Sequence, residues 1–174
     1  MPIAHRSIRP GDQTNPDSFG SMPNQEGFIQ MREAFQACGG LAHGHMLDRV
    51  FELQGRADRV APLILSGQLL AFDWRRMRWI PLFQLDGRKL ALSGPVLQEA
   101  LARLKTWCTP WQAAAWFADC NAGLDGARPM EMMKSDPSSV LDAARSDGSV
   151  DTPYQPVPLH AARRVGRTVH AAAP

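Results

Sequence analysis

The sequence has little of what marks several large classes of protein. Its 174 residues contain three cysteines, Cys38, Cys108 and Cys120, in no C-x-x-C spacing, and their odd number argues against a disulfide framework. No apolar run approaches the ~20 residues of a membrane-spanning helix, and the first residues lack the apolar stretch of a secretory signal. We therefore expect a cytoplasmic protein with buried thiols and no membrane partner.

The sequence also lacks a large excess of positive or negative residues. The formal net charge is +2, and between Glu26 and Gly148 fourteen Lys and Arg residues oppose fourteen Asp and Glu residues. A protein that binds nucleic acid over a large surface usually has a strongly basic balance. DNA binding must therefore be argued from local clusters of charge.

Motifs of catalytic and cofactor chemistry are missing as well. The sequence has no G-x-S-x-G, no H-E-x-x-H and no G-x-x-x-x-G-K motif. Three of the five histidines, His5, His160 and His170, lie in the chain ends, where no packed shell would hold a catalytic imidazole. The pair His43 and His45 falls short of the three or four ligands of a zinc site, so it is interpreted as a polar turn. We predict no enzyme, no cofactor and no metal site.

Apolar spacing predicts a folded middle, with residues 1–25 as a flexible arm and 149–174 as a flexible tail. Helical spacing favours a helix from Glu26 to before Gly39, a second around 46–51 that ends at Gly55, and a third over 58–65. Extended runs over 69–74 and 78–85, separated by a turn at 75–77, predict a β-hairpin. Pro81 predicts that the second strand is an edge strand or is bulged.

The order of three helices and a hairpin over 26–92 is typical of a winged helix-turn-helix domain, and a plain α+β core has the same order. Residues 93–148 form a predicted helical bundle, because caps followed by proline recur at Gly94-Pro95, Thr109-Pro110 and Asp136-Pro137. The predicted fold class is therefore mostly α with a small β-hairpin. A winged helix-turn-helix-like N-terminal part would be followed by a C-terminal helical bundle.

Five arginines are candidate DNA contacts. Arg75, Arg76 and Arg78 lie at the predicted hairpin tip, where guanidinium groups of a wing can contact phosphates or enter the minor groove. Arg56 and Arg59 precede or begin the predicted third helix and would lie near a major groove if that helix reads DNA. Arginine is common on exposed turns, so a solvated surface explains the same residues.

The stretch over 111–145, WQAAAWFADCNAGLDGARPMEMMKSDPSSVLDAAR, resembles the toxin-binding domain of the MbcA/ParS/Xre antitoxin family. The preceding segment, with its P-x-F-Q sequence at 81–84, is similar to family members in which a small winged element ends before the bundle. Cys120 departs from the family's usual proline, and Met130 to Met133 replaces its usual leucine-containing pair. The positions that match the pattern are Trp116, Asn121, Leu124, Gly126, Pro129, Met133 and Val140.

The resemblance implies a dimer or higher homo-oligomer that binds its own operator DNA and a cognate toxin. The toxins of this family are of the RES type and consume NAD, and the antitoxin blocks their active-site cleft. On this basis Trp116, Asn121, Leu124, Gly126 and Pro129 are candidate partner-binding residues. Packing of the tryptophan in the bundle core and capping of the loop by the asparagine side chain explain the same residues, which then mark the interface only indirectly.

The sequence therefore predicts an antitoxin-like regulator that neutralises a toxin and binds operator DNA. The alternative is a protein-interaction module with the same fold that neither binds DNA nor neutralises a toxin. Arg163, Arg164 and Arg167 of the tail are a candidate second contact with the partner.

Overall fold

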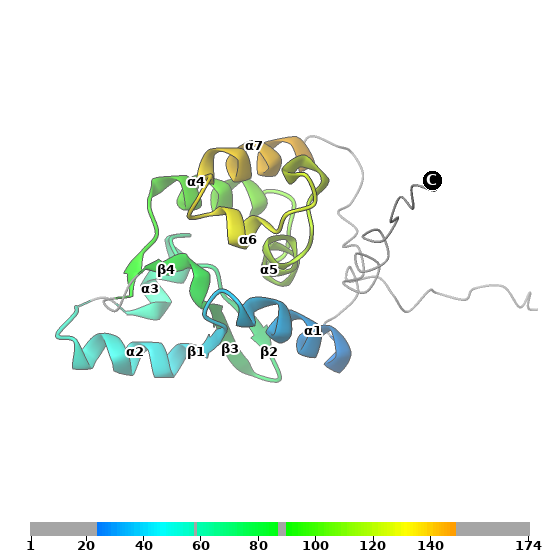
Figure 1. Cartoon of the computed structure of the whole chain (residues 1–174). Coiled ribbons are helices and arrows are strands. Elements are labelled where there is room, and N and C mark those ends of the chain that lie inside the picture. Colours follow the sequence, from blue (N-terminus) through cyan, green and yellow to red (C-terminus); the bar gives the residue numbers. More distant parts are fainter. Residues whose placement is uncertain (1–23, 58, 87–89, 149–174) are drawn as a thin grey trace, which may run out of the picture.

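A helical bundle packs over a small antiparallel sheet and its flanking helices in the computed structural model, which describes residues 24–57, 59–86 and 90–148 (Figure 1). The mostly helical fold class with a small β element is confirmed. The predicted tail and most of the predicted arm lie outside the described residues. The elements in chain order are α1 (Gln25–Gln36), β1 (Leu41–His43), α2 (Gly44–Leu53), α3 (Val60–Leu65), β2 (Phe72–Trp74), β3 (Met77–Pro81), η1 (Leu82–Gln84), β4 (Leu85–Asp86), β5 (Ala91–Leu92), α4 (Pro95–Leu104), α5 (Pro110–Ala118), η2 (Ala122–Leu124), α6 (Pro129–Met132) and α7 (Pro137–Asp147).

Side-chain caps fix where three of the described helices, α1, α5 and α7, begin. The Asn24 side chain accepts a hydrogen bond from Gly27 N at 2.7 Å, so α1 begins at the last residues of the predicted arm. Thr109 and Gln112 form a reciprocal capping box at the start of α5. The four predicted helices of 93–148 are confirmed, and each has a proline in its first turn. Within the described ranges, no helix is both long and apolar enough to cross a membrane.

The sheet has the order β1-β3-β2, with antiparallel pairing throughout. The sequence did not predict β1, and the expectation that Pro81 makes its strand an edge strand is wrong, because β3 is the central strand. Pro81 is the last residue of β3, and Leu82 N donates to Gly40 O just beyond it at 2.9 Å. The strands are also shorter than predicted, and a second pair, β4–β5, follows.

Side chains on the two faces of the hairpin belong to two different clusters of apolar side chains. Phe72 of β2 belongs to the larger cluster, and its ring meets Trp111 of α5 edge-on at 5.2 Å. Ile80 of β3 belongs to the smaller cluster with Leu47 and Phe51 of α2. This division follows from the alternation of side chains along a strand.

The larger cluster is continuous across the predicted boundary between residues 92 and 93. It includes Met31 and Phe35 of α1 together with Leu97 of α4 and Trp116 of α5. Phe83 stacks on Phe35 at 5.8 Å and lies 4.8 Å from Phe117, so one aromatic ring joins the two halves. The N-terminal elements and the bundle therefore share one core.

Candidate functional site

A loop between α5 and α6 is closed by one carboxylate of α7. Asp147 Oδ2 accepts hydrogen bonds from Trp116 Nε1 at 2.7 Å and from Asn121 Nδ2 at 2.8 Å. The Asn121 side-chain oxygen accepts from Gly123 N at 2.8 Å, which makes the turn at the start of η2. The end of α5, the loop and the end of α7 are thus joined through three side chains.

Five of the seven residues that match the antitoxin pattern lie in or beside this loop. Trp116, Asn121, Leu124 and Pro129 are buried, and Gly126 is exposed with a φ of +81°, a conformation that favours glycine. Gly126 N donates to Asn121 O at 2.9 Å and so closes the loop. Four of the five predicted partner-binding residues therefore shape the loop from inside, and a partner would meet it through their exposed neighbours.

Those neighbours form a small surface in which charged side chains of both signs flank exposed backbone. Ala122, Gly123 and Asp125 are exposed, and Asp125 has a φ of +53°, so the turn presents backbone as well as side chains. Arg128 and Glu131 flank it and lie 3.8 Å apart as an ion pair. The surface around the loop suits recognition of another protein, because its shape is fixed by the groups buried beneath it.

Cys108, a partly buried cysteine before α5, has an unreactive thiol. Burial, together with a smaller effect of the negative charge of Asp147, raises the pKa of the Cys108 thiol to about 12. Because the thiolate is the nucleophile, a thiol with so high a pKa reacts slowly at neutral pH. Cys108 therefore acts as a small apolar group here.

The hairpin tip is a two-residue turn rather than the predicted three-residue turn. Arg75 and Arg76 have φ angles of +48° and +62°, and Met77 already pairs with Trp74. This turn type favours Asn-Gly, since each non-glycine residue with positive φ costs about 1 kcal/mol or more. Two arginines at these positions place two cations at the tip of the β2–β3 hairpin in spite of that cost.

Intramolecular contacts engage several of the predicted DNA-binding arginines. Arg78 forms a two-pronged hydrogen bond with Asp73, at 3.0 and 3.1 Å, which raises the pKa of the guanidinium. Arg75 donates to the Gln25 side chain at 2.7 Å and lies over the Trp74 ring. Arg76 is exposed.

The two arginines near α3 lie in the loop before it. Arg56 donates to Leu90 O at 2.8 Å and stacks on the Phe51 ring, with its guanidinium carbon 3.9 Å from the ring centre. Arg59 donates to Arg56 O at 3.4 Å and directly precedes Val60, whose N–H is capped by Asp48 at 2.7 Å. These contacts fix the loop that leads into α3.

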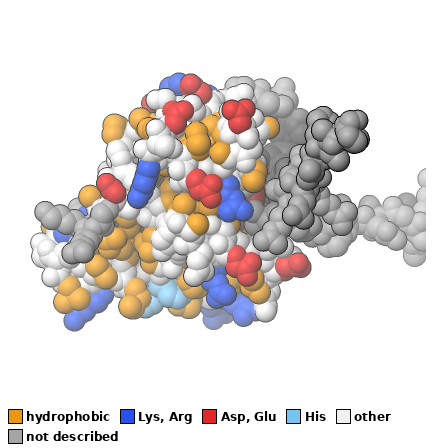
Figure 2. All heavy atoms as spheres, in the orientation of Figure 1, with side chains coloured by type: hydrophobic (Ala, Val, Ile, Leu, Met, Phe, Trp, Pro, Cys, Tyr) orange, Lys and Arg blue, Asp and Glu red, His pale blue; other side chains and the backbone are white. Residues whose placement is uncertain are grey.

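The exposed side of α3 is apolar. Its sequence is VAPLIL; Val60 and Leu63 are buried, and Leu65 is 82% exposed. A helix that reads base edges needs hydrogen-bonding side chains, which α3 lacks. On the face drawn in Figure 2, acidic and basic side chains are interspersed. Any nucleic-acid contact of the N-terminal half would therefore come from the tip of the β2–β3 hairpin.

The segment with two histidines is not the predicted polar turn. His43 ends β1 and Gly44 begins α2, so the chain passes directly from strand to helix. The His43 ring lies 3.8 Å from the Trp79 ring and 5.5 Å from the His45 ring. In the described ranges, no three His, Cys, Asp or Glu side chains gather as a metal site would require.

Gln84 has a structural role that its place in the P-x-F-Q sequence did not indicate. It is fully buried, and its amide nitrogen donates to Leu70 O at 2.7 Å and to Pro81 O at 2.9 Å. Its side-chain oxygen accepts from Leu70 N at 2.8 Å. The residue therefore holds the α3–β2 segment against the end of β3.

Comparison of the chain with models of protein families, with curated proteins and with solved structures finds no match. What this site binds is therefore inferred from its residues and their geometry.

Proposed function

We propose that this chain is an antitoxin-like regulator, whose C-terminal bundle binds and neutralises a partner toxin. The observation that carries the proposal is the convergence of Trp116, Asn121 and Gly126 on one loop closed by Asp147. These residues belong to the pattern that resembles the toxin-binding domain of the MbcA/ParS/Xre family.

The proposed partner is a toxin of the RES type, which consumes NAD. The antitoxin would act by covering the toxin's active-site cleft, so its own surface has to be rigid and need not be reactive. A homodimer or higher homo-oligomer is part of the same proposal. Toxin expressed from the neighbouring gene should arrest cell growth alone and lose its effect when this chain is co-expressed.

The exposed loop alanine offers a direct test of the docking surface. Ala122→Arg adds a large charged side chain at the start of η2, so toxin binding should weaken by at least tenfold through the lost fit. Isothermal titration with the purified toxin measures this, and the melting temperature should stay within about 2 °C of wild type.

Ala102→Arg on α4 is the matched control, because Ala102 is also an exposed helical alanine. It should bind like the wild type. Equal binding by both variants would place the interface away from the loop.

DNA binding is a second candidate function, favoured by the topology of the N-terminal half. The order α1-β1-α2-α3-β2-β3 with a β1-β3-β2 sheet supports a winged helix-turn-helix domain, in which Arg75 and Arg76 would lie at the tip of the wing. Because the exposed side of α3 is apolar, we propose that the wing contacts the phosphate backbone and that sequence reading by α3 is weak.

Arg76→Ala should weaken binding to a duplex of the chain's own promoter and reduce the slope of log affinity against log salt by about one unit. Fluorescence anisotropy between 50 and 200 mM salt measures the slope. Arg49→Ala is the control, since Arg49 is an exposed arginine of α2 paired with Glu52. If the wild type shows no salt-dependent binding, the protein is an interaction module that does not bind DNA.

A further inference from the structure

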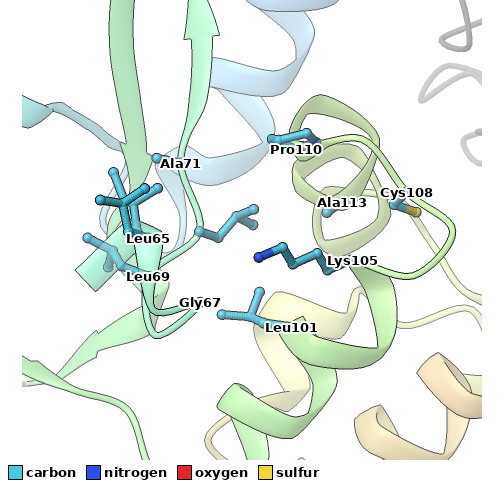
Figure 3. A pocket seen from close by; sticks show the side chains of 11 residues that line it. Leu65, Gly67, Leu69, Ala71, Leu101, Lys105, Cys108, Pro110 and Ala113 are labelled. Carbon is cyan, nitrogen blue, oxygen red and sulfur yellow. The ribbon is translucent and has the colours of Figure 1, made fainter. Parts of the chain in front are cut away.

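An apolar groove of about 450 Å³ lies between α3 and the bundle (Figure 3). One wall comes from α3 and the segment before β2, including Leu65 and Leu69. The other comes from the end of α4 and the start of α5, including Leu101, Pro110 and Ala113. The groove is separate from the loop closed by Asp147 and from the wing.

The lining has one charged side chain. Figure 3 shows Lys105 reaching from the α4 side toward the opposite wall. Leu65, at the end of α3, is 82% exposed, which is unusual for a leucine beside other apolar side chains. An apolar surface with one cation fits an extended apolar segment that has a carboxylate near one end.

The C-terminal end of α7 lies beside this groove. A Cβ atom on Gly148 would overlap the Trp107 indole ring, so Gly148 lies directly against that ring. Cys108, the next residue after Trp107, lines the groove and feels the charge of Asp147. The residues that follow Gly148 in the sequence therefore begin next to Trp107, which is two residues after Lys105 in the chain.

We propose that residues 151–159 of the same chain, Asp-Thr-Pro-Tyr-Gln-Pro-Val-Pro-Leu, bind in this groove. Asp151 is three residues beyond Gly148, a contour of roughly 10 Å, and supplies the carboxylate for Lys105. Tyr154, Val157 and Leu159 supply the apolar groups.

The composition of this segment suits binding in an extended form. Three prolines within nine residues favour a polyproline II backbone, so little conformational entropy is lost on binding. A short tether also gives an effective concentration in the millimolar range, so even a weak contact is well populated. A partner segment that uses the groove would first have to displace residues 151–159.

The test uses the full chain with Val157→Ser and Leu159→Ser together, which removes two apolar groups outside the described core. Val165→Ser with Val169→Ser is the matched control, because it makes the same chemical change further along the chain. Two-dimensional NMR of the labelled proteins should show shifts at Leu69, Leu101 and Ala113 in the first variant and none in the control.

A labelled synthetic peptide of residues 150–160 gives a second measurement. It should bind the Val157→Ser/Leu159→Ser variant at least tenfold more tightly than the wild type or the control, because only that variant leaves the groove open. Lys105→Glu should weaken peptide binding to that variant, and an Asp151→Lys peptide should restore it.

Unchanged groove signals in the variant, or equal affinity of the peptide for variant and wild type, would overturn the proposal. Groove signals that depend on protein concentration would assign the groove to a second copy of the chain and would also overturn it. Either result leaves the docking surface at the α5–α6 loop untouched, since that surface is tested with the toxin.

Discussion

Replacement of Asp147 by alanine should lower the free energy of unfolding by about 2–4 kcal/mol. Its carboxylate accepts from the buried Trp116 indole and from the buried Asn121 amide, and each donor left unpaired costs about 1–3 kcal/mol. Urea unfolding followed by circular dichroism measures the loss. The same variant should bind toxin at least tenfold more weakly, since the loop loses its tie to α7.

Asp142→Ala is the matched control on the same helix. Asp142 is exposed and pairs with Arg145, and surface pairs of this kind contribute at most about 1 kcal/mol. Asp147→Asn keeps one acceptor at the same place and should fall between the other two variants. If Asp147→Ala is no less stable than Asp142→Ala, the network does not hold the loop.

The helices could be predicted from the sequence because their signals are local. Thr109 and Gln112 are three residues apart, and the side chain of each accepts a hydrogen bond from the backbone N–H of the other. The Asp136 side chain caps α7 by accepting from the backbone N–H of Ser139. Hydrogen bonding from Ser139 also lowers the pKa of the Asp136 carboxyl, which keeps it ionised at the helix start. Residues that interact within one helical turn are close in the sequence, so their pattern can be recognised in a short stretch of it.

The sheet could be predicted only in part because its pairing is not local. β1 has three residues, and its partner Pro81 lies forty positions after Leu41. Three residues show no alternation that would distinguish a strand from a turn. The place of β3 in the centre of the sheet follows from β1, so missing β1 led directly to the wrong expectation for Pro81.

The candidate site, like the sheet, could be predicted only in part from the sequence. The sequence drew attention to Trp116 and Asn121, but nothing in their spacing indicated that Asp147 would accept from both. The hairpin tip was placed correctly near Arg75 and Arg76, whereas the ion pair of Arg78 with Asp73 depends on cross-strand register. Side-chain partners that are distant in sequence become visible only once the fold brings them together.

Gln84→Met should destabilise the protein by about 3–5 kcal/mol, although methionine fills nearly the same volume. The substitution leaves the N–H and carbonyl of Leu70 and the carbonyl of Pro81 without their hydrogen bonds in a fully buried place. Gln36→Met, at the exposed last residue of α1, is the control and should change the stability by less than about 0.5 kcal/mol. Urea unfolding of both variants gives the comparison.

Gln84→Ala separates the hydrogen bonds from the packing. Alanine removes the same three hydrogen bonds and adds a cavity, so it should cost more than methionine, by about 1–2 kcal/mol. Gln84 anchors the segment that includes Leu69 and Leu70, which line one wall of the apolar groove. Both variants should therefore also loosen that wall and weaken binding of the peptide of residues 150–160 to the groove. A methionine variant as stable as the wild type would mean that backbone groups near Leu70 find other partners. In that case the hydrogen bonds of Gln84 to Leu70 and Pro81 would not be the reason for glutamine in the P-x-F-Q sequence.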